Sequence, residues 1–295
     1  MEYQMKLMDK RQEMMFWWLM RNGREMLKET QKRFYYNLPV AEGSIRSLQL
    51  ELLGLLQKFD EICKKNEIIY WLDAGNLLGA VRHKGFVPWD DDLDVCISRK
   101  NFLRLCKIIE NQDEVEIRYQ YDNKNIYCYA KLFYKKKNLP LFIDFDIYDE
   151  VLCRDWQDVE KRWKERSRLK AECAVKLRKY FRNYNNAILT NVKDISFLRN
   201  TFSEYAEKLD DNSGNYMMVS IEFPDDLCNG VRCYPKEWFF PASFMEFEGQ
   251  RFPVPHETEK YLTMLYGDIY SLPSDAGYQR HIQLEELQKL LRNNI

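Results

Sequence analysis

The stretch Tyr70-Trp-Leu-Asp-Ala-Gly-Asn-Leu-Leu-Gly-Ala-Val-Arg-His-Lys-Gly-Phe-Val-Pro-Trp-Asp-Asp-Asp-Leu-Asp-Val-Cys-Ile97 contains the features on which the rest of the chain depends. Its pattern predicts an apolar strand, a glycine turn, a short helix, a proline-containing loop and a second strand. The second strand opens with four carboxylates, those of Asp90, Asp91, Asp92 and Asp94. Like charges this close together repel and carboxylates weaken strands, so a bound cation explains the cluster better than packing does.

Length and composition favour a folded protein over a disordered one. The chain has 295 residues, of which 31% are charged and 15% aromatic, and its net charge is −1. It is long enough to bury a substantial core, as one large domain or two small ones. A net charge near zero supplies no global basic field, so nucleic acid is not an expected partner.

The cysteine pattern is typical of a protein from a reducing cytoplasm. The eight cysteines contain no CxxC pair, and most of them lie inside apolar stretches, as free buried thiols do. Cys228 and Cys233 are close together, which is only a weak zinc signal. No secretory signal is visible, and no run reaches the ~20 apolar residues that a membrane-spanning helix needs. We therefore expect a cytoplasmic protein.

Residues 1–45 are predicted to form a helical N-terminal extension. Within it, residues 14–20 form a dense apolar run with basic residues on both sides. Such a segment, at residues 10–24, could lie on the inner face of a membrane as a peripheral contact. The alternative, which we favour, is a helix packed on the body of the protein or on a second subunit, since Met and Trp fill cores readily.

The rest of the chain predicts an α+β fold, with a mixed sheet flanked by helices. Residues 46–152 are expected to form the catalytic core, and residues 153–295 a helical and irregular C-terminal part that completes the domain. A lysine- and arginine-rich helix at 155–185 is typical of a solvated face, the alternative being a surface for an anionic acceptor or a membrane. The predicted elements of the core are helices at 44–66 and 98–109 and strands at 68–72, 126–134 and 141–148.

Two further carboxylates, Asp144 and Asp146, interrupt an apolar strand, which is costly unless they are paired or bound to metal. Residues two apart on a strand share a face, so Asp92 and Asp94 should project together. Asp144 on an adjacent strand, about 4.8 Å away, could complete the set. Three convergent carboxylates suit one or two Mg²⁺ (or Mn²⁺) ions, whose other ligands are water and phosphate oxygens.

The glycine turn predicts a phosphate site beside these carboxylates. Gly75 and Asn76 follow a strand and begin a short helix, so backbone N–H groups and the helix N-terminus are available to an anion. A calcium loop of the EF-hand type is excluded, although the acidic run at 90–94 imitates its beginning. Such a loop needs Gly at its sixth position and Glu at its twelfth, where this chain has Val95 and Asn101.

The motif at residues 73–94 resembles the signature of the LicD family, which includes bacterial phosphocholine transferases and is related to fukutin and fukutin-related protein. The resemblance spans about residues 48–282 and continues through Phe142-Ile-Asp-Phe-Asp-Ile-Tyr-Asp149, Phe247-Glu-Gly, Val254-Pro, Tyr261-Leu and Tyr266-Gly-Asp268. It implies a metal-dependent transferase of the nucleotidyltransferase fold. Such enzymes move a phospho-alcohol group, here most simply phosphocholine from CDP-choline, onto a glycan hydroxyl, and CMP leaves. The implied acceptor is a cell-surface glycan such as lipopolysaccharide or teichoic acid, free or lipid-linked.

The resemblance also implies roles for individual residues. Asp92, Asp94 and Asp144 would be metal ligands, with Asp90 as a nearby support. The residues that would contact the donor are Arg82, His83 and Lys84 at the diphosphate, together with Lys131 and His281. The alternatives are a solvated loop for the basic run 82–84 and an ordinary surface histidine for His281.

Two departures from the family pattern bear on the site. Asn76 replaces the usual Ser or Thr, and its amide can still donate to phosphate. Asp146 stands where an apolar residue is usual, and it shares a face with Asp144 on the strand. It could be an extra ligand, a general base or an acceptor contact.

A choline group would need aromatic faces for its quaternary ammonium. The aromatic residues nearest the motifs are Trp71, Trp89, Tyr127, Tyr129 and Tyr148, although such side chains more often pack in a core. Two other functions share the same pattern. One is a nucleotidyltransferase that releases pyrophosphate, and the other is a non-catalytic, membrane-associated interaction protein.

Overall fold

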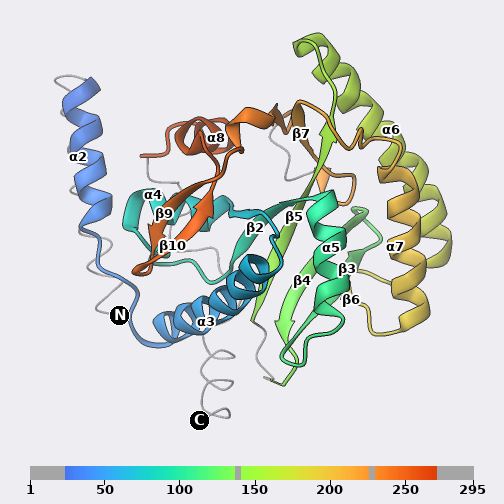
Figure 1. Ribbon diagram of the computed structural model, residues 1–295, viewed down its shortest axis with the longest axis horizontal. Helices are drawn as coiled ribbons and strands as arrows, with labels where there is room; N and C mark the ends of the chain where they lie inside the picture. Colours follow the sequence, from blue (N-terminus) through green and yellow to red (C-terminus); the bar gives the residue numbers. More distant parts are fainter. Residues whose placement is uncertain (1–23, 137–140, 226–229, 271–295) are drawn as a thin grey trace.

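The structure is a computed structural model that describes residues 24–136, 141–225 and 230–270 (Figure 1). The apolar run at 14–20 and His281 lie outside these ranges, as does most of the segment 10–24 for which a membrane contact is predicted. Among the residues described, no helix combines the length and the apolar character needed to cross a bilayer.

A single mixed sheet of eight strands organises the fold, so the predicted α+β class is confirmed. Its main path runs β1-β2-β5-β4-β3-β6, and β7 joins β5 on one side and β8 on the other. The pair β2–β5 is parallel, whereas the other pairs described in this sheet are antiparallel. The strands are β1 Tyr70–Leu72, β2 Asp94–Ser98, β3 Val115–Asp122, β4 Tyr127–Tyr134, β5 Phe142–Val151, β6 Ala187–Ile188, β7 Tyr216–Val219 and β8 Cys233–Pro235.

Helices surround this sheet, and a separate hairpin completes the C-terminal part (Figure 1). Helices α6 and α7 lie against each other at one side of the molecule, and α3 and α5 pack on β5. The hairpin consists of β9 Ser243–Phe247 and β10 Gln250–Val254. The helices are α2 Arg24–Tyr36, α3 Gly43–Lys65, α4 Ala74–His83, α5 Arg99–Ile109, α6 Trp156–Tyr180, α7 Val192–Ala206, α8 Thr258–Tyr266 and the 3₁₀ turn η2 Lys236–Trp238.

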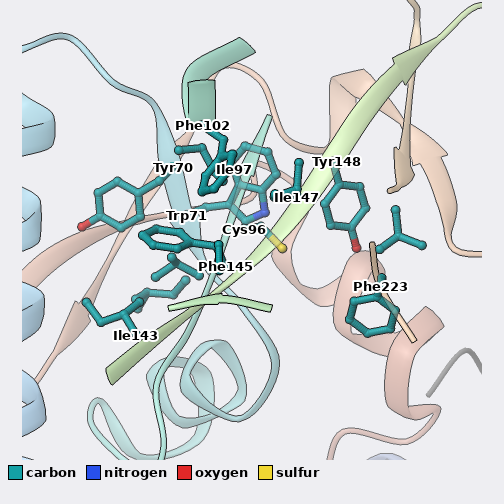
Figure 2. Packing of buried hydrophobic residues seen from close by; sticks show 14 of the residues in the cluster. Tyr70, Trp71, Cys96, Ile97, Phe102, Ile143, Phe145, Ile147, Tyr148 and Phe223 are labelled. Carbon is teal, nitrogen blue, oxygen red and sulfur yellow. The ribbon is translucent and has the colours of Figure 1, made fainter. Parts of the chain in front are cut away.

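Strand β5 divides the core into two sides, because alternate residues of a strand point to opposite faces. Phe145 faces α3 and α5, where its ring centre lies 5.5 Å from that of Phe59 and 5.6 Å from that of Phe102. Tyr148 points to the other face and lies beside Phe239. Figure 2 shows the aromatic and aliphatic side chains that pack around β2 and β5. The carboxylates Asp144 and Asp146 share the face of Tyr148.

Two details differ from the sequence prediction. Strand β2 begins at Asp94 and not at Asp90, because a turn that starts at Val87 closes with an Asp90 N–H bond to the Val87 carbonyl (2.9 Å). Three successive carboxylates then disfavour strand pairing. Strand β3 was not predicted, since its charged and polar residues leave only a weak apolar alternation.

The basic helix predicted at 155–185 is α6, and it is not wholly a solvated face. Arg166 is fully buried, and it donates to the carbonyls of Val219, Ser220 and Phe223. Lys170 is also buried and donates to the Phe223 carbonyl. These two cations fasten the segment that follows β7 to α6.

Candidate active site

A row of charged side chains crosses three neighbouring strands at one level of the sheet. Asp94 on β2 is opposite Asp144 on β5, and Asp144 is opposite Lys131 on β4. Residues opposite each other in register project to the same face. The Lys131 ammonium nitrogen lies 2.6 Å from Oδ1 and 2.8 Å from Oδ2 of Asp144. The structure therefore brings together two of the three predicted metal ligands and the predicted lysine.

The acidic segment before β2 is fixed by Asn76 on the first turn of α4. The Asn76 amide oxygen accepts from the Asp94 N–H (2.6 Å), and its nitrogen donates to the Asp92 carbonyl (3.3 Å). Asn76 is fully buried. Its observed contacts are thus with the carboxylate segment, where it holds Asp92 and Asp94, and not with an open surface at which phosphate would bind.

Gly75 is required by the close approach of Asp90. A Cβ atom added at Gly75 would lie 2.5 Å from Asp90 Oδ2, closer than any side chain tolerates. Asp90 Oδ2 is itself buried and has no hydrogen-bond partner among the described residues. Burial, followed by the charge of Asp92, raises the pKa of Asp90 well above the usual carboxyl range. The start of α4 therefore faces a carboxylate whose buried oxygen can accept a further ligand.

Asp94 is the electrostatic centre of the cluster. Burial raises its pKa well above the usual carboxyl range, and the charges of Asp92, Asp144, Asp146 and Asp73 raise it further. A bound divalent cation would reverse this effect, since it stabilises the ionised form of each carboxylate that it contacts. The donor set consists of carboxylate oxygens, which suits Mg²⁺ or Mn²⁺.

A second group on the same face was not predicted as a unit. Asp73, Cys96 and Asp146 are buried, and one ligand atom from each lies within 4.8 Å of the others, an arrangement compatible with a metal ion. Among the residues described, Asp92, Asp94 and Asp144 are not gathered this tightly. Asp144 is instead paired with the Lys131 ammonium group.

Arg232 supplies the positive charge of this second group. Its Nη2 lies 3.7 Å from Asp73 Oδ2 and 3.6 Å from Asp146 Oδ2. The same nitrogen donates to the Tyr148 hydroxyl at 3.0 Å. Burial raises the pKa of Asp146 to about 8, and the charge of Arg232 opposes that increase. Asp146 is therefore a carboxyl group whose pKa lies near neutrality.

Tyrosine hydroxyls complete the network below Asp73. The Tyr261 hydroxyl donates to Asp73 Oδ1 at 2.8 Å and lies 3.1 Å from the Tyr148 hydroxyl. The Cys96 thiol donates to Asp73 Oδ2 at 2.6 Å. Sequence reasoning missed the roles of Asp73, Tyr261 and Arg232. Asp73 and Tyr261 lie inside the quoted motifs and could have been singled out, whereas Arg232 lies in a region without any local signal.

The basic run that was predicted to bind diphosphate is not brought to the carboxylates. Helix α4 has 10 residues, so its ends are about 15 Å apart, and Asp73 and Asn76 lie at the opposite end from His83. Arg82 is buried against α2, with its guanidinium 4.2 Å from the centre of the Tyr35 ring. Lys84 forms an ion pair with Glu246 at 3.1 Å.

His83 also faces α2. Its Nδ1 lies 2.9 Å from the Tyr35 carbonyl oxygen, and its Nε2 is buried without a hydrogen-bond partner among the described residues. Burial lowers the pKa of His83 to about 4. A neutral, packed histidine of this kind serves the α2–α4 contact and does not supply charge to a phosphate.

The aromatic side chains near the motifs fall into two classes. Trp71 and Tyr148 are fully buried in the core, as Figure 2 shows, whereas Trp89, Tyr127 and Tyr129 are partly exposed. Tyr129 is close enough to the carboxylates for their charges to act on its hydroxyl. Burial raises its pKa, and the charges of Asp146, Asp144 and Asp94 raise it further. Its ring also lies 6.2 Å from that of Phe223, beside Arg232.

Comparison with known proteins is consistent with this geometry. Residues 67–168 match the family described as LicD/FKTN/FKRP, nucleotidyltransferase domain, a range that includes every carboxylate of the cluster. The chain is 28% identical over 257 residues to the lipopolysaccharide cholinephosphotransferase LicD of Haemophilus influenzae, and the match covers 81% of this chain and 96% of that protein. An uncharacterised protein of Rickettsia prowazekii is 34% identical over 111 residues, which cover 36% of this chain and 40% of that protein. An uncharacterised protein of Rickettsia typhi is 33% identical over 104 residues, 34% of each chain.

Proposed function

Since this chain belongs to the LicD family, we propose that it is a transferase that moves phosphocholine from CDP-choline onto a hydroxyl group of a lipopolysaccharide glycan. The observation that carries the proposal is the row of Lys131, Asp144 and Asp94 across three strands, within the residues that match the family. The relative from Haemophilus influenzae, which is similar over nearly its whole length, supports the choice of phosphocholine and lipopolysaccharide.

The proposed cofactor is Mg²⁺ or Mn²⁺, held by Asp92, Asp94 and Asp144 with the buried oxygen of Asp90 beside them. When bound, the ion would neutralise the donor diphosphate and stabilise the oxygen that leaves with CMP. Asp94 and Asp144 suit this role because they are opposite each other in register, and Asn76 holds the backbone on both sides of Leu93.

Lys131 has two tasks in this proposal. Its ammonium group holds the Asp144 carboxylate in position, since a charge-assisted bond at 2.6 Å is strong and directional. Its positive charge also favours the negatively charged phosphates of the donor on the same face of the sheet. Lys131 is buried among Phe142 and Tyr129, which limits the movement of its side chain.

Asp146 is the proposed general base for the acceptor hydroxyl. It lies two residues from Asp144 on the same face of β5, and burial raises its pKa to about 8. A general base works best when its pKa lies near the working pH. The group is then deprotonated often enough to act, and it is basic enough to take the proton. The attacking sugar oxygen would lose its proton to Asp146 as it bonds to the phosphorus of phosphocholine, and CMP would depart on the opposite side.

The test is a panel of CDP-linked alcohols assayed for CMP release with and without Mg²⁺, beside CTP assayed for pyrophosphate release. The proposal expects CMP from CDP-choline, together with dependence on the metal. Asp94→Asn should abolish the signal, whereas Asp113→Asn, an exposed carboxylate in the turn after α5, should leave it unchanged. Pyrophosphate release from CTP with no CMP from any CDP-alcohol would instead identify a nucleotidyltransferase.

A further inference from the structure

Asp73, Cys96 and Asp146 together offer the ligand types of a metal site, but the charged side chain of Arg232 already lies beside them. Asp73 precedes α4, Cys96 lies on β2 and Asp146 on β5, and one ligand atom from each lies within 4.8 Å of the others. The charges of Asp73 and Asp146 are among those that raise the pKa of Asp94. This group therefore adjoins the proposed metal ligands on the same face of the sheet, as the second ion of a two-metal site would.

Arg232, which immediately precedes β8 of the same sheet, lies beside this group. Its Nη2 is nearly equidistant from Asp73 Oδ2 (3.7 Å) and Asp146 Oδ2 (3.6 Å). Only 8% of Arg232 is exposed, so water screens its charge weakly. A divalent ion bound to both carboxylates would have to lie against this guanidinium, and the two positive charges would repel each other.

The guanidinium is also held in place and has little freedom to leave. It donates to the Tyr148 hydroxyl at 3.0 Å, and its carbon lies 4.3 Å from the centre of the Phe223 ring. Phe223 in turn is fastened by Arg166 and Lys170 of α6, which both donate to its carbonyl. Figure 2 shows Phe223, Tyr148 and Cys96 gathered at this place.

We propose that Arg232 is the built-in second cation of the site, so that the protein binds one divalent ion and not two. Arg232 is a positioning residue in this account. It neutralises Asp73 and Asp146 and keeps Asp146 aligned on β5, while the single divalent ion binds at Asp92, Asp94 and Asp144. The inference rests on the proposed function for the position of that first ion.

The test counts Mn²⁺ ions bound to the full-length protein by equilibrium dialysis, so it needs no turnover. We expect one ion for the wild type, two for Arg232→Met, and one again for Arg232→Lys, which restores the charge. In Arg232→Met the second ion should contact Cys96, so Cd²⁺ should produce a thiolate-to-metal absorption band. That band should be missing from the wild type and from the double variant Arg232→Met/Cys96→Ser.

Two results would overturn the inference. One is a wild-type protein that binds two Mn²⁺ ions, of which Asp73→Asn removes one; this result does not depend on whether Arg232→Met folds. The other is a folded Arg232→Met variant, as judged by circular dichroism, that still binds one ion and shows no Cd²⁺ band. If the dialysis gives the expected numbers of bound ions but the wild-type protein does not transfer phosphocholine, the proposed substrate is rejected and the role of Arg232 stands.

Discussion

The ammonium nitrogen of Lys131 lies 2.6 Å from Oδ1 of Asp144, on the strand next to it. This contact sets one boundary of the carboxylate cluster, and the guanidinium of Arg232 beside Asp73 and Asp146 sets another. Asp94 lies opposite Asp144 in register, and its pKa is raised by burial and by its acidic neighbours. The site is thus a negatively charged surface bracketed by two fixed positive charges, which suits a single added cation and a phosphate-bearing substrate.

Lys131→Met should impair catalysis without unfolding the protein. A hydrogen bond to a charged group contributes about 1.5–3 kcal/mol, so the loss corresponds to a roughly 10- to 100-fold decrease in kcat/KM for CDP-choline. Steady-state CMP release measures the change. Lys161→Met, at an exposed position of α6, is the matched control and should retain full activity. Equal activity in both variants would exclude a role for Lys131.

Gly75→Ala should disturb the acidic segment, because the new Cβ would lie 2.5 Å from Asp90 Oδ2. We expect Mn²⁺ affinity to fall at least tenfold, with the far-ultraviolet circular dichroism unchanged. Gly54→Ala in α3 is the control, since its Cβ would meet only the Tyr134 hydroxyl, at 3.5 Å. That change should raise the free energy of unfolding by up to about 1 kcal/mol through helix propensity. Undiminished Mn²⁺ affinity in Gly75→Ala would contradict the placement of Asp90.

Asn76→Ala should lower the free energy of unfolding by about 1–3 kcal/mol, since a buried N–H and a buried carbonyl lose their partners. Without the Asn76 side chain, the Asp92–Asp94 segment is no longer held in position and should also bind Mn²⁺ more weakly. Urea unfolding and a Mn²⁺ titration of the same samples measure the two effects. Asn111→Ala removes a solvent-exposed side-chain bond to the Lys107 carbonyl and should change neither. Weakened folding with unaltered Mn²⁺ binding would show that Asn76 does not organise the ligands.

His83 predicts a pH dependence of stability. Its pKa is about 4 in the folded protein and about 6.5 when unfolded, so the unfolded chain binds the extra proton first. The contribution of neutral His83 is complete above pH ~6.5 and is lost as the pH falls toward 4, by at most about 3 kcal/mol.

His83→Asn keeps a donor for the Tyr35 carbonyl and removes the titration. Urea unfolding between pH ~4 and ~7 should therefore show a shallower decline for His83→Asn than for the wild type. Parallel curves for the two proteins would mean that His83 is protonated, or exposed, in the folded state.

The sequence predicted the strand that carries Asp144 and its neighbour β2, because apolar residues and carboxylates alternate there in a pattern that packing alone cannot explain. It also predicted helices α3 and α5 from their apolar periodicity, and α6 as a helix rich in lysine and arginine. The family resemblance added the chemistry, and its strongest motif includes Asp94 and Asn76.

Other features depend on tertiary contacts that no local pattern records. The run Arg82-His83-Lys84 resembles a phosphate site by composition, yet the length of α4 carries it away from the carboxylates, toward α2 and the β9–β10 hairpin. Arg232 immediately precedes β8, and it lies more than 80 residues beyond Asp146 in the sequence. Its partners could be identified only once β7 and β8 were placed next to β5.

The most direct test of the central claim is phosphorus NMR of the full-length protein mixed with CDP-choline, Mg²⁺ and a lipopolysaccharide acceptor. We expect the diphosphate signals to disappear while equal amounts of CMP and a new phosphodiester on the glycan appear, and we expect Asp94→Asn to leave the diphosphate intact. Persistence of CDP-choline in the presence of acceptor and metal, or its conversion without a glycan phosphodiester, would contradict the account.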